Sequence, residues 1–279
     1  MTAWIGVALA TAPAGADAMD SRLPTYLHPM AGRPLYWHTL SALAAHDPPP
    51  PRLHVVTNAE LRADLFADLP VAAQVDGDLA PLLAALGASG GAPPALLLVD
   101  AAAPTLHADL PHLTASAEPL ALLGADGLPV AVWLPPERLA LLHAADDLAG
   151  LAGRLPAEVC RAAAPDGFVV RDRVAFAGAV ALTRDRLVRR LMENGASVLL
   201  PQSVLVDVDV RVGRDTILYP GVMLEGQTTV GQETVIGPGC RIVDSWIGSG
   251  VELKGWNYVS HTSIRNRAIL EPYVRRGYD

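Results

Sequence analysis

An aliphatic residue recurs at every sixth position near the end of the chain, and this repeat restricts the fold more than any other feature of the sequence. The repeating positions are Val206, Val212, Leu218, Leu224, Val230, Ile236, Ile242, Ile247, Leu253, Val259, Ile264 and Leu270, and the spacing shortens to five residues before Ile247 and before Ile264. Glycine follows some of them, at Gly213, Gly231, Gly237 and Gly248, where a tight corner favours a residue without a side chain. Strands of an ordinary β-sandwich would instead alternate with period two. The repeat therefore predicts a parallel β-helix of about four triangular coils.

The chain before residue 200 has a different pattern, in which short apolar runs alternate with longer stretches rich in Ala and Leu. Such alternation is typical of a parallel sheet with crossover helices, and it predicts a doubly wound α/β domain. The predicted strands cover residues 4–10, 53–57, 95–99 and 131–134, and the predicted helices cover residues 35–45, 60–65 and 79–86. A length of 279 residues suits two domains, which we place at residues 1–200 and 201–279.

Charge and cysteine content exclude some classes of function. The net charge of -8 argues against nucleic acid as a partner. The two cysteines are far apart and lack CxxC spacing, which predicts neither a disulfide framework nor a zinc site and suits the reducing cytoplasm. No apolar run approaches the roughly 20 residues of a membrane helix. The apolar opening of the chain is expected to be a buried strand; a signal peptide is the alternative, but no Lys or Arg precedes the run.

Residues 212–226 and 235–245 resemble the first β-helix coils of the bifunctional N-acetylglucosamine-1-phosphate uridyltransferase and glucosamine-1-phosphate acetyltransferase family. Residues 191–196 resemble the helix that leads into those coils, and residues 23–35 resemble the motif after the family's nucleotide loop. The resemblance implies a nucleotidyltransferase-like, Rossmann-like domain followed by a short left-handed β-helix, and assembly as a trimer. Burial of flat apolar coil faces between three copies would be the physical reason for the trimer.

The family's nucleotide loop reads Gly-x-Gly-Thr-Arg-Met and is followed by a Leu-Pro-Lys motif. In this chain the loop begins at Ala10 and keeps only Gly15 of the glycines, Ala18 stands where the Arg belongs, and Thr25 stands where the Lys belongs. Both missing residues are cations that the family directs at phosphates, and loss of one such charge typically costs about a hundredfold to a thousandfold in rate. Arg22 is a cation that could substitute for them.

Asp100 ends a predicted strand and resembles the family's Mg²⁺ ligand, in the position where ligands bind to α/β sheets. The second ligand of the family is an Asn, but here the position is Arg171, whose guanidinium cannot ligate a metal. Gln74 resembles the family's uracil contact, although Asp76 and Asp78 follow it and would repel a triphosphate. The resemblance therefore implies Mg²⁺ as cofactor only if the chain is active.

In the family, the acetyl-transfer base is a His on later coils. Residues 271–277 resemble the turn that precedes those coils, and the sequence ends at residue 279. We therefore expect the coils that carry the base to be absent. His261 is the one histidine in the repeat region. It is either a general base on a coil corner, with Lys254, Asn257 and Tyr258 near it, or an ordinary solvated corner residue.

Two hypotheses for function follow. The first is a degenerate, catalytically impaired relative with a structural or regulatory role in UDP-N-acetylglucosamine metabolism, which forms a trimer with itself or with an active homologue and binds a nucleotide or nucleotide sugar weakly at most. The alternative is an active sugar-1-phosphate nucleotidyltransferase or a hexapeptide acyltransferase. Retention of Gln74 and Asp100 supports the alternative, whereas Ala18, Thr25 and Arg171 support the first hypothesis.

Overall fold

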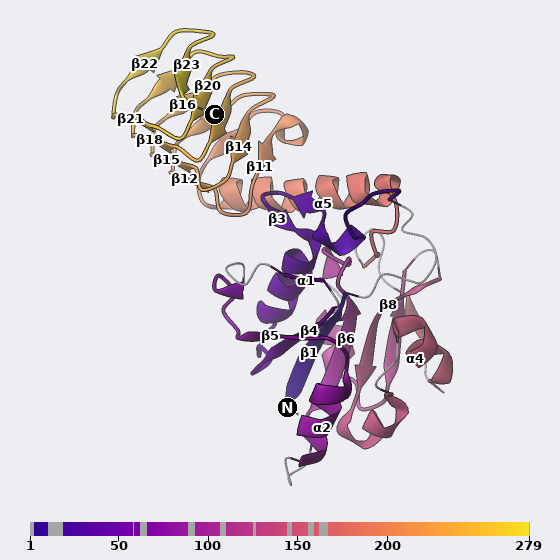
Figure 1. The fold of residues 1–279 in the computed structure, drawn as a ribbon. Coiled ribbons are helices and arrows are strands. Elements are labelled where there is room, and N and C mark those ends of the chain that lie inside the picture. Colours follow the sequence, from indigo (N-terminus) through magenta and orange to yellow (C-terminus); the bar gives the residue numbers. More distant parts are fainter. Residues whose placement is uncertain are drawn as a thin grey trace. The chain divides into compact units, whose positions relative to one another are not determined.

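The structure of the protein is a computed structural model that divides the chain into two compact units (Figure 1). The residues it describes are 3–10, 19–57, 59–61, 66–88, 93–106, 110–124, 127–143, 147–155, 159–161 and 167–278. Unit 1 comprises Met1–His28 and Pro34–Phe176, and unit 2 comprises Pro29–Arg33 and Ala177–Asp279. The division falls within helix α5 (Arg173–Glu193), whereas the sequence predicts a boundary at 200/201.

Unit 1 is built on a seven-stranded sheet with the order β5-β4-β1-β6-β8-β7-β9. The strands are β1 (Trp4–Leu9), β4 (Leu53–Val56), β5 (Ala73–Asp76), β6 (Ala95–Asp100), β7 (Leu120–Leu123), β8 (Pro129–Leu134) and β9 (Val159–Arg161). The helices are α1 (Leu35–Ala44), α2 (Ala80–Ala88), α3 (Leu110–Thr114) and α4 (Leu148–Arg154), with the short 3-10 helices η1 (Thr25–Leu27) and η4 (Pro136–Leu141). All four predicted strands are present, as β1, β4, β6 and β8.

The predicted parallel sheet is present except for one strand, β8. Strand β8 runs antiparallel to both β6 and β7, whereas β5, β4, β1 and β6 are parallel. Apolar periodicity predicts a buried strand without its direction, which explains the error. Two of the predicted helices are found as α1 and α2, while the third, at 60–65, lies largely outside the described residues.

The strand order reverses direction beside β1. The chain passes from β1 to β4 and β5 on one side and then returns to β6 on the other side. In the register of these strands Leu9 pairs with Asp100, so the carboxyl ends of β1 and β6 meet at one edge of the sheet. Ligands of open α/β sheets bind at such a reversal of strand order. We call this edge the carboxyl edge of unit 1.

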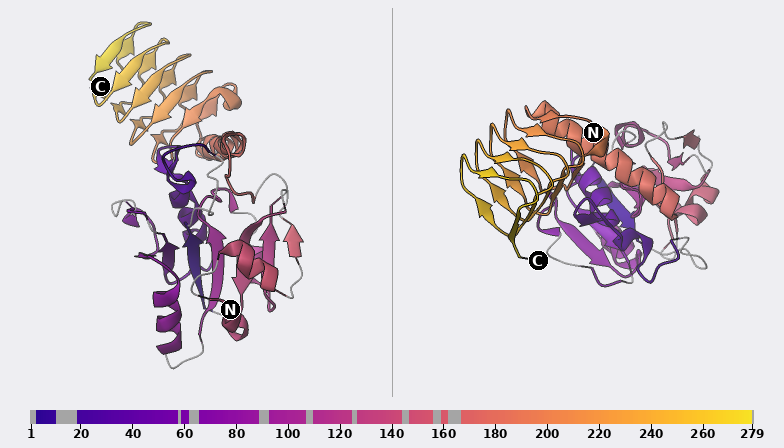
Figure 2. Two further views of the ribbon diagram at one scale, coloured as in Figure 1. Left: turned by 45° about the vertical axis from the view of Figure 1, so that its right-hand side comes forward. Right: turned by 90° about the horizontal axis from the view of Figure 1, so that it is seen from above.

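Unit 2 contains three parallel sheets that the chain visits in turn (Figure 2). Their strand orders are β10-β13-β16-β19-β22, β11-β14-β17-β20-β23 and β12-β15-β18-β21. The strands are β10 (Ser197–Val198), β11 (Leu205–Val206), β12 (Arg211–Val212), β13 (Ile217–Leu218), β14 (Met223–Glu225), β15 (Thr229–Val230), β16 (Val235–Ile236), β17 (Arg241–Val243), β18 (Trp246–Ile247), β19 (Glu252–Leu253), β20 (Tyr258–Ser260), β21 (Ser263–Ile264), β22 (Ile269–Leu270) and β23 (Arg275–Gly277). This is the arrangement of a three-sided parallel coil.

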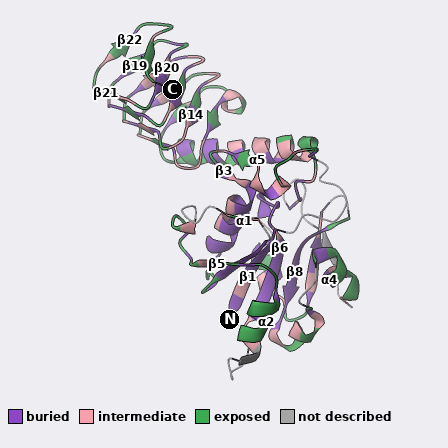
Figure 3. Cartoon of the chain, in the orientation of Figure 1, coloured by how far each residue is buried: buried purple, intermediate pink, exposed green. Residues whose placement is uncertain are grey.

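The six-residue repeat is confirmed position by position. Each of its aliphatic residues lies on one of the strands β11 to β22, and all are buried except Val212, which is partly buried against the same core (Figure 3). Leu218 pairs with Ile236, and Ile236 pairs with Leu253, so each aliphatic stacks on the one a full coil away. The shortened spacing falls at corners where Asp244 and His261 adopt left-handed backbone angles, with φ of 41° and 46°. The register is therefore kept although two corners lose a residue.

Two further properties concern the chain as a whole. None of the described helices is long and apolar enough to cross a membrane. Cys240 is a free cysteine whose side chain is buried in the core of the coils.

Candidate functional site

Asp100 is the last residue of β6 and lies at the carboxyl edge of unit 1. One oxygen of its carboxyl group accepts a hydrogen bond from the backbone N–H of Ala102, at 2.8 Å. The next residue, Ala101, donates its N–H to the carbonyl oxygen of Leu9 at 3.0 Å, which fixes this turn against the end of β1. Burial raises the pKa of Asp100 to about 6, while the Ala102 hydrogen bond and the charge of Arg171 act in the opposite direction.

Arg171 reaches the same edge from a distant part of the sequence. The backbone N–H of Val170 donates to the carbonyl oxygen of Ala102 at 2.8 Å, and the side chain of Val170 is buried. This contact holds the following residue close enough for its guanidinium charge to lower the pKa of Asp100. The structure therefore brings together the two residues that the sequence motifs assigned to the metal position, one carboxylate and one cation.

The phosphate-loop residues are only partly described. Ala10 is buried and donates its N–H to the carbonyl oxygen of Val56 at 2.8 Å, beside the carboxyl edge. Gly15 and Ala18 lie outside the described residues. Arg22 is exposed, and Thr25 is the first residue of η1.

A hydrogen bond ties η1 to the end of β4. The hydroxyl oxygens of Tyr26 and Thr57 lie 3.0 Å apart, and the Tyr26 side chain is buried. Thr57 directly follows β4, and its backbone N–H donates to the carbonyl oxygen of Asp76 at 2.9 Å. The segment that contains Thr25 is therefore anchored near the strand ends.

Gln74 lies on β5 and is exposed, but its side-chain amide is already engaged. Its Nε2 donates to one carboxyl oxygen of Asp76 at 2.8 Å, and Nδ1 of His54 lies 2.7 Å from the other oxygen. Both His54 and Asp76 are buried. This buried pair was not predicted from the sequence, although the histidine inside the predicted apolar strand 53–57 was a signal for a buried polar contact.

The residues at the carboxyl edge do not fit a resident Mg²⁺ ion. In the part of the chain that the structure describes, no group of three or more His, Cys, Asp and Glu side chains could hold a metal. Asp100 is the one predicted ligand, and the charge that acts on it is the guanidinium of Arg171. Mg²⁺ needs oxygen ligands, and a guanidinium supplies none and repels a cation.

His261 lies at a coil corner of unit 2, as expected, and both of its ring nitrogens face neighbours. Nδ1 is 2.7 Å from the hydroxyl oxygen of Ser260, and Nε2 is 3.5 Å from a carboxyl oxygen of Asp244. The ring also stacks on Tyr278, with centroids 5.9 Å apart. The ring therefore contacts three residues of its own corner, and the side chain stays 44% exposed, as expected for a solvated corner residue.

The polar residues suggested as partners of His261 are engaged elsewhere. Lys254 Nζ lies 2.6 Å from a carboxyl oxygen of Glu271, and Asn257 Nδ2 donates to the carbonyl oxygen of Glu271 at 2.6 Å. The ring of Tyr258 lies between the guanidinium groups of Arg241 and Arg275, at 5.8 Å and 5.2 Å from its centroid. These contacts hold one coil to the next and give the residues a structural role.

No family model matches the chain. A bifunctional protein GlmU from Geobacillus sp. (strain WCH70) is 40% identical over 106 residues, which are 38% of this chain and 23% of that protein. The bifunctional protein GlmU of Acetivibrio thermocellus is 40% identical over 110 residues, 39% of this chain and 24% of that protein. The chain thus spans about a quarter of the length of these curated relatives. These matches show that it is related to the GlmU proteins.

Similar solved structures were also found. The crystal structure of Rv0371c from Mycobacterium tuberculosis H37Rv is 19% identical, with a TM-score of 0.42, and the match covers 64% of this chain and 97% of that one. The 4-diphosphocytidyl-2C-methyl-D-erythritol synthase of Anaerococcus prevotii is 10% identical, with a TM-score of 0.42 and coverage of 65% and 98%.

Proposed function

We propose that this relative of the GlmU proteins is a catalytically impaired sugar-1-phosphate nucleotidyltransferase-like protein with a structural or regulatory role in UDP-N-acetylglucosamine metabolism in the cytoplasm. The observation that carries the proposal is the charge of Arg171 beside Asp100 at the carboxyl edge. Nucleotidyl transfer requires cations that offset the charge of the phosphates, and a metal ion held by carboxylate and amide oxygens. The chain has a guanidinium where that metal needs its second ligand.

Two further features support the same proposal. Ala18 and Thr25 lack the positive charge that the relatives direct at the phosphates. The amide of Gln74 donates one N–H to Asp76, which places a negative charge next to the residue assigned to the base and near any bound phosphates. Each loss weakens nucleotide binding through a different interaction, and together they leave a nucleotide bound weakly at most.

Calorimetric titration of the full chain with UTP, with and without Mg²⁺, tests this proposal. We expect no binding tighter than about 1 mM, which corresponds to about -4 kcal/mol, and no effect of Mg²⁺. Binding in the micromolar range that requires Mg²⁺ would show a functional metal site and overturn the proposal. Titration of an Arg171→Ala variant serves as the matched control, because it removes the cation without adding a metal ligand.

We further propose that the coils of unit 2 wind in the left-handed sense of the family and assemble as a trimer, either of this chain alone or with an active homologue. Outward-facing apolar residues on one sheet support an interface: Leu205 and Met223 pair on the neighbouring strands β11 and β14 and are 40% and 38% exposed. Exposed apolar side chains on regular strands are typical of association surfaces. Sedimentation velocity of the full chain should give the mass of a trimer, and a monomer at micromolar concentration would contradict a homotrimer.

The rival functions make different predictions. An active nucleotidyltransferase must show Mg²⁺-dependent nucleotide binding at Asp100, which the same titration measures. A hexapeptide acyltransferase would need a free base, but Ser260 and Asp244 face both ring nitrogens of His261. Hydrolysis or transfer from an acyl thioester that disappears in a His261→Asn variant would support that rival.

A further inference from the structure

The outer coil of unit 2, which we define as residues 263–278, carries a concentration of positive charge. It contains four arginines and one glutamate, so its net charge is +3 in a chain whose net charge is -8. The arginines, all of them exposed, are Arg265, Arg267, Arg275 and Arg276. The carboxyl group of the glutamate, Glu271, already lies 2.6 Å from Nζ of Lys254 on the preceding coil. Strands β21, β22 and β23 of this coil are each the last in their sheet, so the charge lies at one end of the stack (Figure 1).

Arg276 takes a position that is apolar in the other coils. The residues of this column, in the register of the strands, are Val206, Leu224, Ile242, Val259 and Arg276. The first four are buried aliphatic residues, whereas Arg276 is exposed. A guanidinium is strongly hydrated, and it does not extend an apolar column without a large desolvation cost. The column therefore ends in a cation at the outer end of the stack.

Large apolar side chains accompany these cations. Ile269, Tyr273 and Tyr278 are 62%, 76% and 72% exposed. The ring of Tyr273 also stacks on Trp256 of the preceding coil, which is 55% exposed. Ile269 lies on β22, Tyr273 lies between β22 and β23, and Tyr278 follows β23, so the three are spread around the coil. Tyr and Trp beside Arg are typical of surfaces that contact the head-group layer of a membrane.

The spread of these side chains around the coil favours a flat partner over a groove in another protein, which would enclose one side of the coil. The head groups of an anionic bilayer offer such a surface, with negative charge for the guanidinium groups and an interfacial layer for the aromatic rings. We propose that the outer coil docks unit 2 end-on onto the anionic face of a lipid bilayer. The inference goes beyond the proposed function, because it uses no residue of the carboxyl edge.

Sedimentation of the full chain with lipid vesicles tests the proposal. Vesicles of phosphatidylcholine alone have a neutral surface, and vesicles of equal parts phosphatidylcholine and phosphatidylglycerol have an anionic one. We expect at least about tenfold tighter binding to the anionic vesicles, because each arginine near such a surface contributes about fivefold. Raising NaCl from about 0.1 M to about 1 M should release the chain, since the Debye length falls from about 10 Å to about 3 Å.

Two charge variants locate the contact. Arg275→Ser combined with Arg276→Ser should weaken binding to the anionic vesicles about tenfold to thirtyfold. Arg211→Ser combined with Arg214→Ser removes the same charge from exposed arginines of an inner coil. This control pair should change binding less than about twofold, because the surface potential of a bilayer falls off within a Debye length.

A second pair of arginines keeps the test decisive if the first variant does not fold. Arg265→Ser combined with Arg267→Asn should weaken binding to a similar extent, and Asn tolerates the left-handed backbone at Arg267, where φ is 59°. Fluorescence supplies an independent signal: emission of the chain should shift to shorter wavelength on anionic vesicles, and Trp256→Phe should reduce that shift, since this indole enters a less polar layer.

Three results would overturn the proposal. They are equal binding to neutral and anionic vesicles, equal weakening by the control pair and by the outer-coil pairs, and binding to soluble poly-L-glutamate without binding to vesicles. The last result would assign the outer coil to an acidic protein partner instead of a bilayer.

Discussion

The core of the coils in unit 2 and the carboxyl edge of unit 1 place opposite demands on their side chains. In the coils, each strand contributes one aliphatic residue that stacks on aliphatic residues one coil away, as in the series Leu218, Ile236, Leu253. Hydrophobic stacking has no direction, so Val, Leu and Ile can replace one another there. At the carboxyl edge, the positive charge of Arg171 acts on the carboxyl group of Asp100, so the chemistry of the edge depends on which residue stands at position 171. The coil core therefore tolerates exchange among aliphatic residues, whereas a single substitution changes the charge of the carboxyl edge.

The largest effect is expected inside the coils. Ile236 is fully buried, and an Ile236→Asp change would place a carboxylate in an apolar core without a partner. We expect a loss of more than about 4 kcal/mol of unfolding free energy and disruption of unit 2. Gln232→Asp, at an exposed corner of the same coil, should cost less than about 0.5 kcal/mol. Thermal unfolding followed by circular dichroism distinguishes the two, and equal losses would refute an apolar interior.

The next effect concerns Asp100 and depends on pH. Its pKa rises from 3.8 to about 6 on folding, so the folded chain holds the proton more tightly than the unfolded chain. The resulting stability is fully present below pH 3.8 and is lost as the pH rises through about 6. Asp100→Asn should therefore stabilise unit 1 by about 1 to 3 kcal/mol at pH 8 and by almost nothing at pH 3.5. Urea unfolding at both pH values measures this.

A matched change tests whether the Asp100 effect is local. Asp78→Asn alters an exposed carboxyl group that accepts a hydrogen bond from the Ala80 N–H. The amide oxygen of Asn can accept the same bond. We expect it to leave the unfolding free energy within about 0.5 kcal/mol at either pH. If Asp100→Asn stabilises equally at both pH values, the effect is not caused by ionisation.

Two glycines provide a pair of substitutions with opposite signs. A Cβ atom on Gly231 would lie 2.6 Å from the backbone nitrogen of Ser249 in the next coil, whereas a Cβ atom on Gly153 in α4 would meet nothing within 4 Å. Gly231→Ala should therefore destabilise unit 2 by about 1 to 3 kcal/mol, because the coils would have to separate. Gly153→Ala should stabilise α4 by up to about 1 kcal/mol. Hydrogen exchange of each unit reports both changes, and stabilisation by Gly231→Ala would be inconsistent with close coil packing.

The smallest effect is expected at His261. Its contact with Asp244 joins two exposed side chains, and exposed ion pairs contribute about 0 to 1 kcal/mol. His261→Asn keeps a residue that tolerates the left-handed backbone angle at this corner. We expect the variant to lose no more than about 1 kcal/mol of unfolding free energy, so its midpoint of thermal unfolding should stay close to that of the unchanged chain. A much larger loss would assign the corner a role in holding the coils together.

The difference between the two regions also explains what could be predicted from sequence. The position of every inward aliphatic in the coils follows from a local repeat, since each contact joins residues one coil apart. Asp100 could be placed at a strand end for the same reason, because an apolar run stops there. The direction of β8 could not be predicted, since antiparallel and parallel buried strands have the same apolar pattern.

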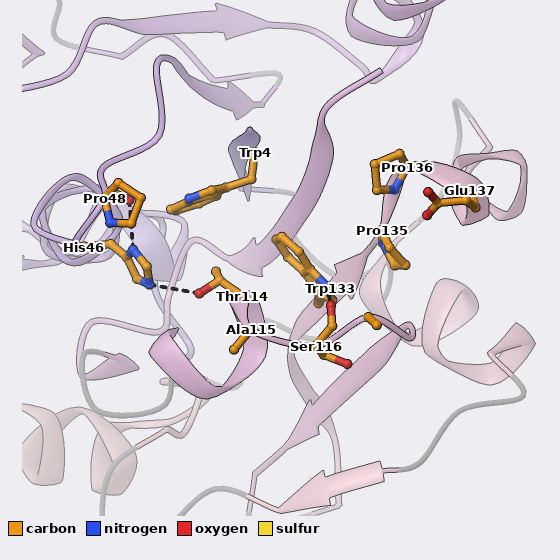
Figure 4. Close-up of a pocket in the computed structure, with 11 residues that line it drawn as sticks. Trp4, His46, Pro48, Thr114, Ala115, Ser116, Trp133, Pro135, Pro136 and Glu137 are labelled. Carbon is orange, nitrogen blue, oxygen red and sulfur yellow. Dashed lines mark hydrogen bonds between the residues drawn. The ribbon is translucent and has the colours of Figure 1, made fainter. Parts of the chain in front are cut away.

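Contacts between distant segments were beyond sequence reasoning. The His54–Asp76 pair joins two neighbouring strands, and nothing local indicates that those two residues share a face. Trp4 at the start of β1, His46 after α1 and Trp133 in β8 line one cavity, although they are far apart in the sequence (Figure 4). Motif resemblance suggested that Arg171 lies near Asp100, but the Val170 to Ala102 hydrogen bond that places it is visible only in the structure.

Uridyl transfer by repaired variants tests the central claim most directly. The variant with Ala18→Arg and Thr25→Lys restores both cations, and a second variant adds Arg171→Asn to restore the oxygen ligand. Turnover of UTP with N-acetylglucosamine 1-phosphate and Mg²⁺ can be followed by release of pyrophosphate. We predict no turnover above background for the double variant, because Arg171 still opposes the metal beside Asp100. Turnover by the double variant as high as that of the triple variant would contradict the account.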